Sequence, residues 1–280
     1  MMSSKRGYFI ENIKKEQLLE LLSKGKRLDG RELTDYRPLK IEVDVIDKAE
    51  GSAKVSLGDT QVIAGVKIEL DEPFPDTPDR GLLIVNAEVL PLASPYSEPG
   101  PPDENAIELA RVVDRGVRES GMIDLGELVL VPGKHVYAIF VDVNVLNIDG
   151  NLFDATSYAI VSALARTKFN KYVIKNGEPV KTDEKIPLPI QTIPVSITAA
   201  RIGDVILLDP NLDEETMMEA RLTFAFDGRG NLCAAQMGGS ESTSEGFTKE
   251  QVLKVVETAK LKAEEIGGLI RRQIGYAEEG

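Results

Sequence analysis

Two groups of charged residues in this chain could carry chemistry, and the first is acidic. The run from Asp209 to Glu215 places four carboxylates within seven residues, directly after an apolar segment. Such a cluster could hold Mg²⁺ or supply a general acid or base. Carboxylates also favour the first turn of a helix, where they meet the positive end of the helix dipole. The residues alone favour this structural interpretation.

The second group is a set of three arginines spaced four and three residues apart: Arg111, Arg115 and Arg118. On one face of a helix they could bind successive phosphates of a single-stranded nucleic acid. Ion pairs on the same helix explain them equally well. Arg115–Glu119 and Asp114–Arg118 have i,i+4 spacing, and Glu108 lies three residues before Arg111. Without further information, the ion-pair interpretation is the simpler one.

A third candidate is the turn that follows the apolar segment Val136–Ile148. Asp149-Gly150-Asn151 breaks this segment, and a helix with many alanines is expected from about Asp154 to Thr167. A strand, a glycine turn and a helix N-terminus form an anion pocket in many folds. However, no Lys or Arg stands between Asp149 and Arg166, and Asp154 adds a like charge. A plain structural turn is therefore favoured.

The composition limits the possible classes of protein. Lys and Arg total 33 and Asp and Glu total 46, so the net charge is −13 and a general nucleic-acid-binding surface is not expected. One cysteine and one histidine exclude an internal disulfide and a two-histidine metal site. We expect no metal and no cofactor, and we expect Cys233 to lie in the core. No apolar run follows the basic residues Met1–Arg6, so a cytoplasmic location without a membrane segment is expected.

Apolar periodicity predicts the elements that must position these residues. The strands expected in the first part of the chain are Ile41–Val45, Ala53–Leu57, Val62–Leu70, Leu82–Leu90 and Val136–Ile148. Those expected later are Val195–Ala200, Val205–Leu208, Leu222–Phe226 and Leu232–Gln236. The expected helices are Ile10–Leu22, Asp103–Ser120, about Asp154–Thr167 and a final helix to about Ile274, which starts at the capping box Thr248–Gln251. Gly238–Gly246 is expected to be a loop.

A hairpin, further strands and a long amphipathic helix occur twice, which indicates two similar halves. We therefore expect an α/β protein of the mixed α+β kind. Its predicted parts are an N-terminal helical extension (1–30), a first lobe (31–175), a connection rich in proline and charge (176–194) and a second lobe with the C-terminal helix (195–280).

Four stretches resemble the RNase PH superfamily. They are Arg27–Arg31 (RLDGR), Gly51–Lys67 (GSAKVSLGDTQVIAGVK), Gly100–Gly121 (GPPDENAIELARVVDRGVRESG) and Leu207–Glu215 (LLDPNLDEE). Within that superfamily the chain is similar to the non-catalytic RNase PH-like subunits of archaeal exosomes. The resemblance implies an RNase PH-like fold of two pseudo-repeated βα lobes with mixed sheets and packed helices.

The resemblance also implies a setting and partners. Three active and three inactive subunits alternate in a hexameric ring, as a trimer of heterodimers, with a trimeric RNA-binding cap on one face. Active members degrade single-stranded RNA from the 3′ end with inorganic phosphate and release nucleoside diphosphates. By the same resemblance, Arg111 and Arg115 would contact RNA near the active site of the adjacent catalytic subunit, and Arg118 would either join them or serve only an ion pair.

Departures from the active pattern bear on the activity. Active members carry a Gly-Thr-Arg phosphate loop after the central strand, whereas this chain has Asp149–Asp154 without an arginine. They also carry two aspartates six residues apart; here Asp209 matches the first and Glu215 stands at the second. Since each charge-assisted contact to phosphate contributes roughly 1.5–3 kcal/mol, no useful activity is expected from this chain alone.

Two other hypotheses stay open at this point. The surviving carboxylates Asp209 and Glu215 could belong to an active phosphate-dependent exoribonuclease. Alternatively, the chain could be an unrelated α/β scaffold with an acidic Mg²⁺ site.

Overall fold

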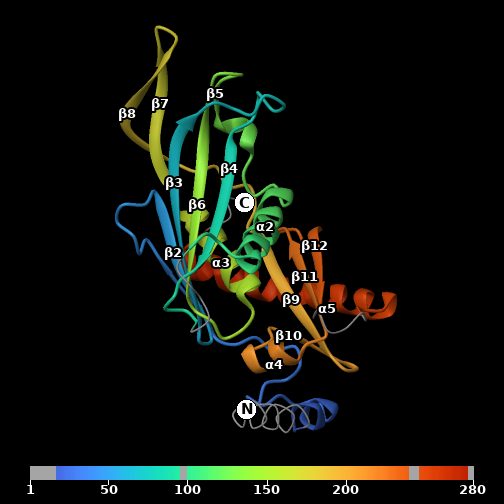
Figure 1. Cartoon of the computed structure of the whole chain (residues 1–280). Coiled ribbons are helices and arrows are strands. Elements are labelled where there is room, and N and C mark those ends of the chain that lie inside the picture. Colours follow the sequence, from blue (N-terminus) through green and yellow to red (C-terminus); the bar gives the residue numbers. More distant parts are fainter. Residues whose placement is uncertain (1–16, 95–99, 240–245, 277–280) are drawn as a thin grey trace.

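A buried helix, α3 (Leu152–Arg166), lies at the centre of the fold, between two β-sheets (Figure 1). The computed structural model describes residues 17–94, 100–239 and 246–276. Twelve of the fifteen residues of α3 are buried. Alanines at 155, 159 and 163 have no exposed surface, and their small side chains allow the neighbouring strands to approach closely.

The first sheet supports the start of α3. Its strands are β1 (Leu39–Val43), β2 (Gly51–Leu57), β3 (Thr60–Asp71), β4 (Leu82–Val89), β5 (Val129–Val131) and β6 (His135–Asn147). The order is β1-β2-β3-β6-β4, and β5 pairs with β6. The central strand β6 runs antiparallel to β3 and parallel to β4. A short 3₁₀ helix, η1 (Leu125–Leu128), precedes β5.

The second sheet packs against the opposite side of α3. Its strands are β9 (Val195–Ile202), β10 (Val205–Leu208), β11 (Ala220–Phe226) and β12 (Leu232–Gly239), in the order β10-β9-β11-β12. The short helix α4 (Leu212–Met217) connects β10 to β11.

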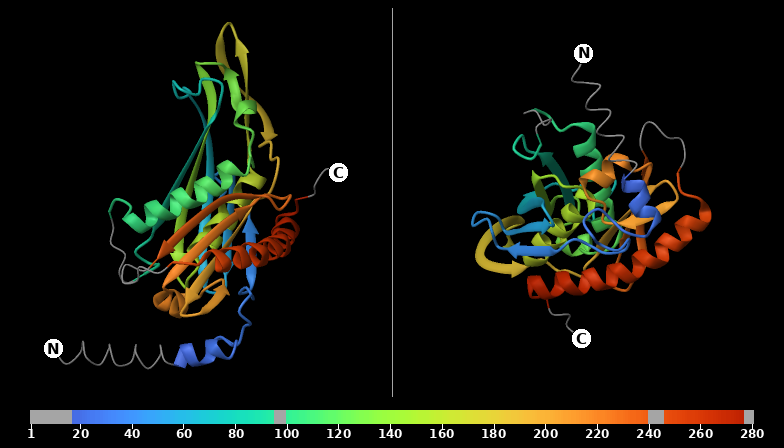
Figure 2. Two further views of the ribbon diagram at one scale, coloured as in Figure 1. Left: turned by 90° about the vertical axis from the view of Figure 1, so that its right-hand side faces the viewer. Right: turned by 90° about the horizontal axis from the view of Figure 1, so that it is seen from below.

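Two long helices, α2 (Glu104–Glu119) and α5 (Lys249–Ile274), cover opposite faces of this second sheet (Figure 2). Gly116 of α2 faces Ser196, whereas Gly267 of α5 faces Val195. Since adjacent residues of a strand point to opposite faces, the two helices lie on opposite sides of β9. Asp103 caps α2, and the predicted capping box of Thr248 and Gln251 is present at the start of α5.

The N-terminal helix packs on the second lobe of the same chain. Residues 17–23 are helical. Leu18 and Leu22 are buried against Ala200, Ile202 and Leu207. The first part of the helix expected at Ile10–Leu22 lies outside the described residues, as do residues 240–245 of the expected loop.

The expected α/β fold of two βα lobes is confirmed, and the predicted strands and helices lie within a few residues of the observed ones. Part of the segment expected to connect the lobes, 176–194, forms β8 (Glu178–Pro187), which pairs with β7 (Lys168–Lys175) in a projecting hairpin (Figure 1). Neither strand was predicted. One expectation was wrong. Cys233 is not a core residue, because β12 is an edge strand and leaves it half-buried. None of the described helices is long and apolar enough to cross a membrane.

Close contact between α3 and β2 gives a first testable prediction. A Cβ on Gly51 would lie 2.5 Å from the carbonyl oxygen of Ala163 and closer still to Thr167 Oγ1. Gly51→Ala should therefore lower the free energy of unfolding by about 1–3 kcal/mol, the usual cost of overpacking. Gly268→Ala is the matched control: it lies inside α5 and its Cβ would meet nothing within 4 Å, so stability should rise by up to about 1 kcal/mol. Urea denaturation measures both, and equal effects would contradict this packing.

Candidate functional site

The carboxylate of Asp209 is fully buried at the end of β10 and accepts five hydrogen bonds. Arg37 binds it through two side-chain nitrogens, Nε at 2.9 Å and Nη2 at 2.8 Å, and through its backbone N–H at 2.8 Å. Arg31 Nη1 donates at 2.9 Å and Asn151 Nδ2 at 2.8 Å. Burial favours a raised pKa for Asp209, but Arg37 and Asn151 outweigh it and lower the pKa below its usual value. Asp209 is therefore held as an anion.

A second ion pair fixes the same region from the N-terminal segment. The side chains of Arg27 and Glu214 are both fully buried. Arg27 donates to the two carboxylate oxygens of Glu214 at 2.8 and 2.5 Å, and to the carbonyl oxygens of Leu208 and Asp209 at 2.8 and 2.7 Å. Glu214 also completes the capping box of α4 with Asn211. The acidic run is thus a helix start, as the structural interpretation predicted, and it is bound by arginines from residues 27–37.

The turn between β6 and α3 is pressed against the loop before α4. Gly150 has a φ of +82°, and a Cβ there would lie 2.5 Å from the carbonyl carbon of Asn211 and 2.6 Å from Pro210 O. Arg37 Nη1 donates to the Asp149 carbonyl oxygen, and Nη2 donates to Gly150 O at 3.2 Å. The turn therefore has a cation after all, but that cation is already bound to Asp209 and to the turn itself.

The amide group at the start of α3 is also occupied. Asn151 N donates to Glu215 Oε1 at 2.7 Å, so a carboxylate of this chain lies where an anion would approach the helix N-terminus. The half-buried position raises the pKa of Glu215, although the Asn151 amide and the charges of Arg221 and Arg37 oppose the shift. The expected structural turn is consistent with this closed arrangement.

Asp154, in the first turn of α3, joins the two lobes. Its fully buried carboxyl group accepts from Tyr36 OH at 2.7 Å, Asn151 Nδ2 at 2.8 Å, and Thr198 N and Oγ1 at 3.0 and 2.8 Å. Burial raises its pKa to about 7, even though these donors favour the ionised form.

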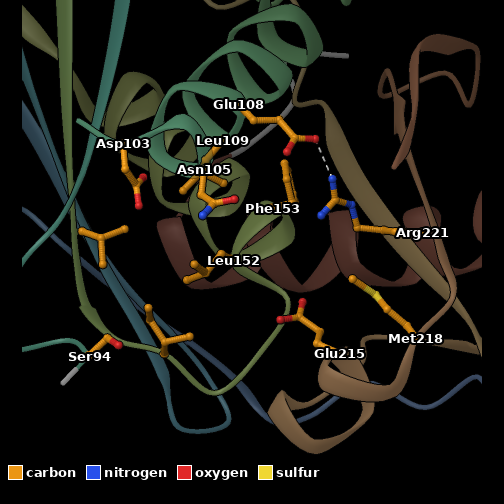
Figure 3. Close-up of a pocket in the computed structure, with 12 residues that line it drawn as sticks. Ser94, Asp103, Asn105, Glu108, Leu109, Leu152, Phe153, Glu215, Met218 and Arg221 are labelled. Atoms are coloured by element: carbon orange, nitrogen blue, oxygen red, sulfur yellow. Dashed lines mark hydrogen bonds and ion pairs between the residues drawn. The ribbon is translucent and has the colours of Figure 1, made fainter. Parts of the chain in front are cut away.

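A pocket of about 340 Å³ lies beside this cluster (Figure 3). Its wall includes three acidic residues, Asp103, Glu108 and Glu215, together with the apolar side chains of Leu152 and Phe153. Arg221 is the one cation among the described lining residues. It donates to Glu108 Oε1 at 2.8 Å, and its guanidinium carbon lies 3.9 Å from the centre of the Phe153 ring (Figure 3). The pocket next to the turn is therefore unfavourable for a free phosphate.

The three predicted arginines lie on α2, as expected, but they differ in their contacts. Arg118 donates to Asp114 at 2.8 Å and to the carbonyl oxygen of Leu83 at 2.8 Å, on the free edge of β4. Within the described part of the chain, Arg111 and Arg115 are exposed and form no ion pair. Glu108, the partner considered for Arg111, instead binds Arg221. Arg111 and Arg115 line a groove between α2 and β12.

The sequence pattern indicated only part of this closed cluster. Asp209 and Glu215 were identified as candidate carboxylates, while Arg31, Arg37 and the buried role of Arg27 were not. The sequence did contain a signal for them, because three arginines lie within eleven residues and an acidic run follows much later in the chain. Among the described residues, no group of three or more His, Cys, Asp or Glu side chains is arranged to hold a metal ion.

Comparison with known proteins identifies the class. The 3′ exoribonuclease family, domain 1, matches residues 35–170, and domain 2 of that family matches residues 192–261. The first match covers the first sheet and α3, and the second covers the second sheet and much of α5, which is the two-lobed RNase PH-like fold. The chain belongs to the 3′ exoribonuclease family.

Individual relatives agree in length and fold. The exosome complex component Rrp42 of Thermococcus kodakarensis is 52% identical over 268 residues, which are 95% of this chain and 97% of that protein. The protein of the same name from Thermococcus gammatolerans is 50% identical over 267 residues, or 95% of this chain and 96% of that protein. A chain in a solved Archaeoglobus fulgidus exosome with RNA bound to the active site is 42% identical, with a TM-score of 0.83; the match covers 92% of this chain and 98% of that one.

The contacts of Arg37 give a second prediction. Arg37→Met removes the main partner of a buried carboxylate and should cost about 3–5 kcal/mol of unfolding free energy. The control is Arg166→Met, since the Arg166–Asp44 pair is 38% and 53% exposed and should contribute at most about 1 kcal/mol. Guanidinium denaturation of the two variants tests the difference, and similar losses would mean that Asp209 does not depend on Arg37.

Asp154 gives a third prediction, on the pH dependence of stability. The folded protein holds a proton on Asp154 up to about pH 7, whereas the unfolded chain releases it near pH 4. Because the folded state then binds more protons, the contribution of Asp154 to stability falls as the pH rises from about 4 to 7. Between pH 5 and 7 the wild type should lose on the order of 2 kcal/mol relative to Asp154→Asn. Parallel stability curves for the two proteins would contradict the raised pKa.

Proposed function

We propose that this chain is a non-catalytic subunit of an archaeal exosome ring. In this role it binds RNA and shapes the active site of a catalytic RNase PH-like partner, which degrades RNA from the 3′ end with phosphate. Three kinds of support converge: membership of the 3′ exoribonuclease family, similarity to proteins named exosome complex component Rrp42, and similarity to a chain of an exosome solved with RNA bound. An alternating ring, a trimeric cap and the cytoplasmic location remain predictions.

The observation that carries the non-catalytic role is the closed turn before α3. A phosphate nucleophile would need the amide groups at the start of this helix and a nearby cation. The Asn151 amide already donates to Glu215, and Arg37 is bound to Asp209, Asp149 and Gly150. The Asn151 amide and the nearby cation are thus both already bound to groups of the chain itself.

The charges around the turn also disfavour phosphate binding. The carboxylates of Asp149, Asp209 and Glu215 surround the turn, and phosphate is an anion that would add further negative charge. To bind, it would have to displace Glu215 and recruit a guanidinium from a buried ion pair. Removing one partner from such a pair costs about 3–5 kcal/mol, which is more than the roughly 1.5–3 kcal/mol that one charge-assisted contact returns.

Arg111 and Arg115 are the residues that we assign to RNA. Both are exposed on α2, neither has an ion-pair partner in the described part of the chain, and they line one groove. Their four-residue spacing places both guanidinium groups on one face of the helix. Arg118 was grouped with them on spacing; its bonds to Asp114 and Leu83 suit a role in holding α2 against β4.

The two competing functions are less well supported. An active phosphorolytic enzyme would need a free cation at the Asp149 turn, and Arg37 is engaged there. A Mg²⁺ site at Asp209 would place the metal ion against the positive charges of Arg31 and Arg37, which already occupy both oxygens of that carboxylate.

RNA binding by the reconstituted ring tests the proposal. The chain is combined with its catalytic RNase PH-like partner, and binding of a single-stranded RNA is measured by fluorescence anisotropy at several salt concentrations. Arg111→Ala with Arg115→Ala should weaken binding roughly tenfold or more. The slope of log K against log salt should become shallower by about 1.4, as expected for two lost phosphate contacts on a single strand.

Arg166→Ala is the matched control, since it removes a partly exposed arginine at the end of α3 and should leave both affinity and salt slope unchanged. Phosphate-dependent RNA decay by the same mixtures should fall with the loss of binding. Unchanged affinity in the double variant would show that α2 does not hold RNA.

A further inference from the structure

A small pocket lies far from the closed turn, between α5 and the turn that joins β11 to β12. It has a volume of about 240 Å³. Three cationic side chains line it: Arg229 on the turn, and Lys260 and Arg271 on α5. The chain as a whole has a net charge of −13.

Glycines at the pocket leave room for these side chains. The Lys260 stem lies on Gly230, with Cε 2.9 Å and Nζ 3.6 Å from the position that a Cβ there would take. Arg271 folds back over Gly267, with Nη1 3.5 Å from the equivalent position. Gly267 also allows α5 to pack closely on the second sheet, since a Cβ there would lie 3.2 Å from Val195 Cγ2.

The Lys260 side chain points toward the pocket although a possible ion-pair partner stands on the same helix. Glu264 stands four residues later on α5, at the spacing that favours an ion pair. Within the described residues, neither Lys260 nor Arg229 forms an ion pair. Their positive charges are therefore available to a ligand.

The acidic residues at the pocket oppose this charge only in part. Asp227 is committed to its own turn, where it accepts from the backbone N–H groups of Arg229 and Asn231 at 2.9 and 2.8 Å and from Asn231 Nδ2 at 2.8 Å. Glu264 is exposed. Because the backbone N–H of Gly228 is also bonded, to Thr192 Oγ1 at 2.8 Å, the side chains must provide the contacts to any anion.

We propose that this pocket binds a diphosphate group, either as free pyrophosphate or as part of a nucleotide. Lys260 and Arg271 are eleven residues apart, about 16 Å along the helix axis, and Arg271 folds back to shorten that span. A diphosphate is elongated, so its oxygens can accept from Lys260 and Arg271 at its two ends and from Arg229 beside its middle. A single phosphate is too compact to contact all three cations together. The inference does not depend on the proposed exosome role.

Calorimetric titration of the full chain tests the proposal, with pyrophosphate, ADP and inorganic phosphate as separate ligands at constant ionic strength. Pyrophosphate and ADP should bind, and inorganic phosphate should bind more weakly. Arg229→Gln combined with Lys260→Gln should weaken pyrophosphate binding at least roughly tenfold. Equal affinities for pyrophosphate and ADP would show that the pocket recognises the diphosphate group alone. Tighter binding of ADP would show that the ligand is a nucleotide.

Two further variants distinguish binding at this pocket from a general effect of the protein's net charge. Lys254→Gln removes an exposed lysine elsewhere on α5 and should leave binding unchanged. Glu264→Gln removes the opposing carboxylate and should tighten binding, a gain that an unfolded variant could not produce. Absence of saturable pyrophosphate binding, or an equal loss in Lys254→Gln and in the double variant of Arg229 and Lys260, would overturn the proposal.

Discussion

The buried pair of Arg37 and Asp209 is the interaction on which the arrangement of the two lobes depends. Asp209 ends β10 in the second lobe, and Arg37 precedes β1 in the first. Asn151 at the start of α3 donates to the same carboxylate. A buried carboxylate without its partners would cost several kcal/mol, so the strand end, the turn and the N-terminal segment are fixed relative to one another. Arg27 and Glu214 reinforce the same junction.

The same constraint limits the chemistry. A site that transfers a phosphoryl group needs donors that are free to meet the anion. Here the Asn151 amide at the start of α3 donates to Glu215, and the Arg37 guanidinium donates to Asp209 and to the carbonyl oxygens of the turn. What remains accessible is the outer face of α2, where Arg111 and Arg115 are exposed. Exposed arginines on α2 and an occupied turn before α3 therefore occur in the same chain, as the proposed function requires.

The sequence predicted most of the fold because apolar periodicity and turn residues are local. Asp149-Gly150-Asn151 marks the end of one element and the Thr248 capping box the start of another, and the structure contains both. It did not predict β8, because the prolines and charges of 176–194 suit an exposed edge strand as well as a loop. The pairing of Arg27, Arg31 and Arg37 with residues about 180 positions later is a tertiary contact, and no local pattern contains it. The sequence also could not show whether Arg111 pairs with Glu108, because Glu108 binds Arg221, which is distant in the chain.

Incorporation of labelled orthophosphate into nucleoside diphosphates tests the central claim most directly. The chain is incubated with single-stranded RNA and radioactive phosphate, alone and together with the catalytic RNase PH-like partner that we propose. A filled phosphate position predicts no labelled nucleoside diphosphate from the chain alone and clear release from the mixture. Labelled product from the chain alone would contradict the account, because Glu215 and Arg37 would then have to give way to phosphate during turnover.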